Sequence, residues 1–101
     1  MLSYSELRNA ACQALLYNVT PNMRIVAASL DANRVRLMFV FERSPSDEEK
    51  ELAYDVAAET SGDFADPPEI NVEFVVDSRH RRAILEEAGA GMHALYARHE
   101  P

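Results

Sequence analysis

Three histidines, His80, His93 and His99, are the side chains best suited to hold a metal ion or relay a proton. None of them has a carboxylate at the spacing of a metal site or a catalytic relay. His93 and His99 could share one face of a strand, but at about 3.3 Å per residue roughly 20 Å would separate them. We therefore expect surface histidines near the C-terminal end and no metal site.

Two other groups of residues could in principle do chemistry. Asp63 and Asp66 flank Phe64, but acid–base catalysis needs two carboxylates whose environments separate their pKa values, and a solvated loop does not provide that. The sole basic cluster, Arg79-His80-Arg81-Arg82, could bind a phosphate or an acidic partner, or it could simply be a solvated turn or the start of a helix. No GxGxxG, P-loop, GxSxG or HExxH motif is present. The sequence predicts no enzyme and no cofactor.

The distribution of negative charge is more informative than any of these groups. Residues 42–66 contain nine acidic and two basic residues, so this segment alone carries a charge of −7. The whole chain also has a formal net charge of −7, because the remaining residues contain eight acidic and eight basic side chains. One quarter of the sequence therefore holds all of the net charge.

The acidic segment also has helical spacing. At about 100° per residue, four acidic residues fall on one narrow stripe with Tyr54 beside it: Glu48, Glu51, Asp55 and Glu59. Each pair of like charges one turn apart costs roughly 0.2–0.5 kcal/mol. The stripe is either a solvated helix face or a recognition surface for a basic partner, with Tyr54 as an anchor and Asp63 and Asp66 extending the surface.

Length and composition restrict the remaining possibilities. A chain of 101 residues predicts a single domain spanning residues 1–101. The acidic pI of about 4.8 argues against direct binding of nucleic acid. Cys12 is the only cysteine and is expected to be a small buried or half-buried apolar residue. There is no secretion signal and no apolar run of the roughly 18 residues that a membrane span needs, so we expect a cytoplasmic protein that does not bind membranes.

Local patterns predict helices at residues 4–17 and 46–62, and strands at residues 23–30, 34–42, 69–77 and 92–98. Ser3 with Glu6, and Ser46 with Glu49, have the spacing of capping boxes at the starts of the two helices. Residues 79–88 are ambiguous and could form a short helix ending at Gly89. The expected order is α-β-β-α-β-β. Because two hairpin-like pairs flank a helix, we expect an α+β fold with a four-stranded, mainly antiparallel sheet. Two helices would pack on one face, and the other face would stay open.

The run ALLYNVTPNMRIVAASLDANRVRLMFVFERSPSDEEKELAYDVAAETSGDF, residues 14–64, resembles a family of small bacterial proteins. Its members are immunity proteins of contact-dependent growth inhibition and related polymorphic toxin systems. Shared features are the leucine-rich helix end, the VTPN-R turn, the hairpin, and the acidic ELA helix followed by a D-F loop. The closing GMHALYARHE is also similar, whereas RHRRAILEEAGA departs from the proline-rich connection usual in the family.

The resemblance implies an inhibitor that binds a cognate toxin domain, often a nuclease, and blocks its active site. The acidic stripe would then steer the inhibitor toward a basic toxin surface. The expected contacts are Glu48, Glu51, Tyr54, Asp55, Glu59, Asp63 and Asp66.

Two alternatives remain open at this point. One is a small ligand-binding or enzymatic domain that uses the open sheet face, including Arg36, His93 and Tyr96. The other is a subunit that dimerises through sheet edges or faces. For the inhibitor itself we expect a monomer or a weak homodimer.

Overall fold

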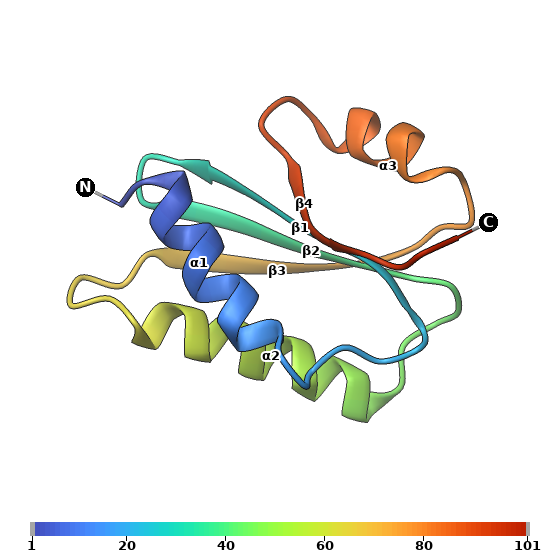
Figure 1. The fold of residues 1–101 in the computed structure, drawn as a ribbon, viewed down its shortest axis with the longest axis horizontal. Coiled ribbons are helices and arrows are strands. Elements are labelled where there is room, and N and C mark those ends of the chain that lie inside the picture. The colour runs from blue at the N-terminus through green and yellow to red at the C-terminus, as the bar shows by residue number, and fades with distance from the viewer. Residues whose placement is uncertain (1, 101) are drawn as a thin grey trace.

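The computed structural model describes residues 2–100, which form three helices and four strands (Figure 1). In chain order these are α1 (Tyr4–Leu15), β1 (Met23–Asp31), β2 (Arg34–Phe41), α2 (Asp47–Gly62), β3 (Glu69–Val76), α3 (Arg81–Ala88) and β4 (His93–Ala97). The strands make one sheet in the order β3-β2-β1-β4. The α+β class and the four-stranded sheet are confirmed.

Side-chain caps start the first two helices where the sequence predicts. Ser3 and Glu6 form a capping box on α1, and Ser46 and Glu49 form one on α2. In each box the serine oxygen accepts from a backbone N–H of the first turn, and the glutamate accepts from the backbone N–H of the serine. Local hydrogen bonds therefore set these two helix starts.

The sheet is mixed, so the expectation of a mainly antiparallel sheet was wrong. β1 pairs antiparallel with both β2 and β4, but β2 and β3 are parallel. The reason is that α2 connects β2 to β3, and this helical crossover carries the chain back to the end of the sheet at which β2 began. The second expected hairpin does not exist, because β3 and β4 lie at opposite edges of the sheet.

The C-terminal quarter contains the element missing from the expected order. The ambiguous segment is helix α3, capped by His80, whose side chain accepts from the backbone N–H of Arg82. A register shift between β1 and β4 lies at Leu95, since Val26 pairs with Tyr96 and Ala27 with Ala94. This irregularity breaks simple alternation, so Tyr96 packs on the cluster beneath α1 and α2 while Met92 belongs to the cluster beneath α3.

Helices cover both faces of the sheet. α1 and α2 pack on one face, where Leu7, Val56 and Phe39 belong to the larger core cluster. α3 packs on the other face, where Ile84 joins a smaller cluster that includes Met38 and Val40. Figure 1 shows α3 apart from the α1–α2 layer. The face expected to stay open is thus partly covered.

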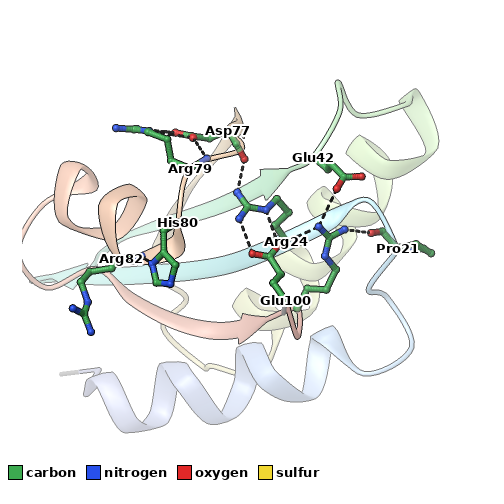
Figure 2. Close-up of polar contacts among 9 residues, drawn as sticks. Pro21, Arg24, Glu42, Asp77, Arg79, His80, Arg82 and Glu100 are labelled. Carbon is green, nitrogen blue, oxygen red and sulfur yellow. Dashed lines mark hydrogen bonds and ion pairs between the residues drawn. The ribbon is translucent and has the colours of Figure 1, made fainter.

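A buried arginine holds the C-terminal end of the chain. Arg24 of β1 is 5% exposed. Its guanidinium donates to both carboxylate oxygens of Glu100, at 2.8 and 2.7 Å, and to the backbone carbonyl of Asp77 at 2.5 Å (Figure 2). One side chain therefore ties together β1, the segment after β3 and the segment after β4.

Candidate functional site

α2 places its carboxylates on the side opposite the core. Ala53, Val56 and Thr60 are buried against the sheet and α1. The four acidic residues of the predicted stripe are all exposed: Glu48, Glu51, Asp55 and Glu59. The loop residues Asp63 and Asp66 are exposed as well. We refer to these six residues as the acidic surface.

No carboxylate of the acidic surface has a salt bridge or side-chain hydrogen bond within residues 2–100. Acidic residues of the sheet and the C-terminal segment behave differently. Five of them each form a salt bridge with an arginine: Glu42, Glu69, Glu73, Asp77 and Glu100. The uncompensated negative charge is therefore concentrated on α2 and the loop that follows it.

Tyr54 lies at the border of the stripe, about 60° around α2 from Glu51. Its ring packs edge-on against Phe74 of β3, with the ring centroids 5.6 Å apart, while 55% of the residue stays exposed. Glu59 lies about 140° away around the helix and lines a groove with α1. The structure thus brings the carboxylates together but directs Tyr54 toward the edge of the sheet.

The C-terminal part of the acidic surface borders two depressions. Glu59 and Asp63 line a groove of about 390 Å³ against Ala10, Gln13 and Ala14 of α1. Asp66 lines a separate depression of about 440 Å³ beside Glu6 and the β1–β2 turn. Carboxylates therefore extend from the first turn of α2 to Glu6 in the first turn of α1.

Glu49 has a role that the sequence indicated only in part. Besides capping α2, it accepts from the hydroxyl of Thr20 at 2.5 Å and from the side-chain amide of Asn22 at 3.2 Å. Burial would raise the pKa of Glu49, but the hydrogen bonds from Thr20, Ser46 and Asn22 outweigh it and lower the pKa. Glu49 thus joins α2 to the TPN turn before β1 instead of facing a partner. Glu49 follows Glu48 of the stripe by one residue, which turns it about 100° around the helix toward the buried side. This position was the signal in the sequence that Glu49 would be engaged within the fold.

The basic cluster is divided by the fold. Arg79 is bound by Asp77 and Glu87, and His80 caps α3. Arg81 and Arg82 have no acidic partner within residues 2–100, and they line a groove of about 540 Å³ between α3 and β4. Figure 2 shows the side chain of Arg82 directed away from Arg24 and Glu100. The tetrapeptide is therefore not one binding unit.

The residues of the alternative sheet-face site are not brought together. Arg36 donates to Glu73 at 2.7 Å and to the carbonyl of Ala88, so it is engaged at the α3 side. His93 instead packs against the ring of Tyr4 in α1, with the centroids 5.4 Å apart. Tyr96 packs on the cluster beneath α1 and α2. These three side chains do not share one pocket.

Residues 2–100 lack two kinds of functional feature. No cluster of three or more His, Cys, Asp or Glu side chains in this part of the chain is arranged to hold a metal ion. No helix in the same range has the length and apolarity required to cross a membrane.

Comparison with known proteins relates the chain to one family and one fold. The family model described as MafI2 immunity protein matches residues 4–100. A solved structure of a tri-AMPylated Shewanella oneidensis HEPN toxin in complex with an MNT antitoxin has a TM-score of 0.52 at 8% identity, covering 93% of this chain and 72% of that chain. A second crystal structure from Shewanella oneidensis has a TM-score of 0.53 at 4% identity, covering 95% of this chain and 74% of that chain. At such identities these two likenesses concern the fold alone. No curated protein matches the sequence significantly.

Proposed function

Because the chain belongs to the MafI2 immunity protein family, we propose that it neutralises a cognate toxin domain by binding it through the acidic surface. The observation that carries this proposal is the row of exposed carboxylates without partners on α2 and its following loop. Such carboxylates can accept cationic side chains without first breaking an internal ion pair. The partner that fits them is a basic protein surface.

A concentrated acidic surface acts on the association rate as much as on the affinity. A concentrated field of one sign draws an oppositely charged partner by long-range attraction and raises association rates by about 10- to 1,000-fold at low ionic strength. A nuclease active site is basic because it binds phosphates. An acidic inhibitor therefore suits a nuclease toxin, which is the activity we propose for the partner.

The proposal excludes Glu49 and does not depend on Tyr54. Glu49 is engaged by Thr20 and Asn22, and Tyr54 packs toward β3. The contact set is then the carboxylates Glu48, Glu51, Asp55, Glu59, Asp63 and Asp66. We propose that the chain acts by occupying the toxin surface and not by modifying it, as the family description of an immunity protein implies.

The test is coexpression with the product of the adjacent upstream gene. We expect the two proteins to copurify, and we expect the chain to abolish the toxicity and the nuclease activity of that product. Failure of the two proteins to bind would contradict the proposed function. A bound toxin without nuclease activity would retain the immunity role and overturn the nuclease assignment.

A further inference from the structure

The two edges of the sheet are built differently. β4 has five residues and a register shift against β1, and both features protect an edge strand from pairing with another chain. β3 has eight residues in unbroken parallel register with β2, and no strand within residues 2–100 pairs with its outer side. Its free backbone groups are therefore available to a further strand.

The outer edge of β3 is also apolar on the side of α2. Ile70, Val72 and Phe74 are half-buried there, and Val76 is 52% exposed. Tyr54 of α2 extends this row through its contact with Phe74. A long, regular edge with exposed apolar side chains is a site for strand addition unless another element covers it.

The local charge of the β3 edge indicates which kind of partner could cover it. Glu69 is paired with Arg34, Glu73 with Arg36 and Asp77 with Arg79, so the carboxylates of β3 and its end are compensated within the chain. Around α2, Glu48, Asp55 and Glu59 lie about 100–140° from Tyr54, and Glu51 lies about 60° from it. The edge is therefore locally neutral, which fits an identical neutral edge and not the basic partner suited to the acidic surface.

We propose that β3 pairs antiparallel with β3 of a second copy of this chain, across a two-fold axis at Val72. Directly opposed residues lie on the same face in antiparallel pairs. This register places Val72 opposite its own copy, Ile70 opposite Phe74, and Asn71 opposite Glu73. A two-fold axis at Glu73 would instead oppose Glu73 to itself and Glu69 to Asp77, and like charges directly opposite one another are destabilising.

The neighbouring helix accommodates such a pair. Figure 1 shows α2 running opposite to β3 along the same part of the sheet. Four helix residues and two strand residues both advance by roughly 6 Å, so from the Tyr54–Phe74 contact Ala58 lies near the level of Val72. Small residues, Ala57, Ala58 and Ser61, would then face the copied helix near the axis. The dimer leaves Glu48, Asp55 and Glu59 on the outer side of α2, and this inference does not depend on the proposed toxin.

The first experiment measures the mass of the purified chain by sedimentation at protein concentrations from about 1 to about 100 µM, since dimerisation follows mass action. We expect a concentration-dependent dimer. Val76→Lys places a charge on the exposed edge and should weaken the dimer at least tenfold, whereas Ala97→Lys on the β4 edge should not. A monomer at all concentrations, or equal effects of the two variants, would overturn the proposal.

The second experiment tests the register in a Cys12→Ser background. Residues directly opposite in antiparallel strands have Cα atoms about 4.5–5.5 Å apart, which allows a disulfide. We expect Val72→Cys to form a disulfide-linked dimer on mild oxidation, while Val76→Cys forms much less. Efficient cross-linking of Val76→Cys but not of Val72→Cys would contradict the two-fold axis at Val72.

Discussion

The guanidinium of Arg24 forms a two-point ion pair with the carboxylate of Glu100, although 76 positions separate them in the sequence. Arg98 also donates to Glu100 and to Glu42. The C-terminal segment is thus fastened to the first strand by charged hydrogen bonds and not by apolar packing. Figure 2 shows this arrangement around Arg24.

Replacing Arg24 should weaken the whole fold. Arg24→Met removes a buried cation, leaves the Asp77 carbonyl without this donor, and leaves Glu100 with Arg98 alone. We expect the free energy of unfolding to fall by about 2 kcal/mol, less than for a fully buried pair because Glu100 is partly exposed. Urea denaturation measures this change. Arg8→Met, at an exposed position of α1, is the control, and an equal loss there would contradict the tether.

Acid should release the C-terminal segment. The hydrogen bonds from Arg24, together with that from Arg98, hold the pKa of Glu100 at about 2, below its ordinary value of 4.5. Because the folded-state pKa is lowered, the contribution to stability is complete above about 4.5 and is lost as the pH falls toward about 2. We expect the protection of the Arg98 amide against hydrogen exchange, relative to the intrinsic rate at each pH, to fall over that range, because this amide donates to the Arg24 carbonyl. An equal pH-dependent fall in protection in Glu100→Gln would count against this cause.

Loss of Glu49 should loosen the connection between α2 and the TPN turn. Glu49→Gln keeps the size of the side chain but weakens its acceptance from Thr20, Asn22 and Ser46. We expect a loss of about 1–2 kcal/mol in the free energy of unfolding. The neighbouring variant Glu48→Gln, which changes an exposed carboxylate without an internal partner, should change it by less than about 0.5 kcal/mol. Thermal or urea unfolding of both variants provides the comparison.

The acidic stripe should be unfavourable for the stability of the free protein. Asp55→Lys converts two like-charge pairs one turn apart, with Glu51 and Glu59, into opposite-charge pairs. We expect the isolated chain to gain about 0.5–1 kcal/mol of stability at low salt and less at high salt. Urea titrations at two salt concentrations measure it. A clear loss of stability at low salt would show that Asp55 has a structural role.

The sequence predicted the features that depend on near neighbours in the chain. Both capping boxes, the β1–β2 hairpin and the exposed face of α2 follow from residues a few positions apart. The parallel pairing of β3, the irregularity at Leu95 and the Arg24–Glu100 pair depend on contacts between distant segments, which local patterns do not encode. For the candidate site, helical spacing located the carboxylates correctly. It did not show that Tyr54 would turn toward Phe74 or that Glu49 would be engaged.

Association kinetics with the cognate toxin domain test the central claim most directly. The double variant Glu51→Lys/Asp55→Lys reverses two charges of the acidic surface, and Asp31→Lys/Glu86→Lys makes the same change in net charge at exposed acidic residues elsewhere. We predict that the first variant lowers the association rate constant at low salt by at least tenfold more than the second, and that this difference shrinks as salt is added. Equal rate constants for the two variants would contradict binding through the acidic surface.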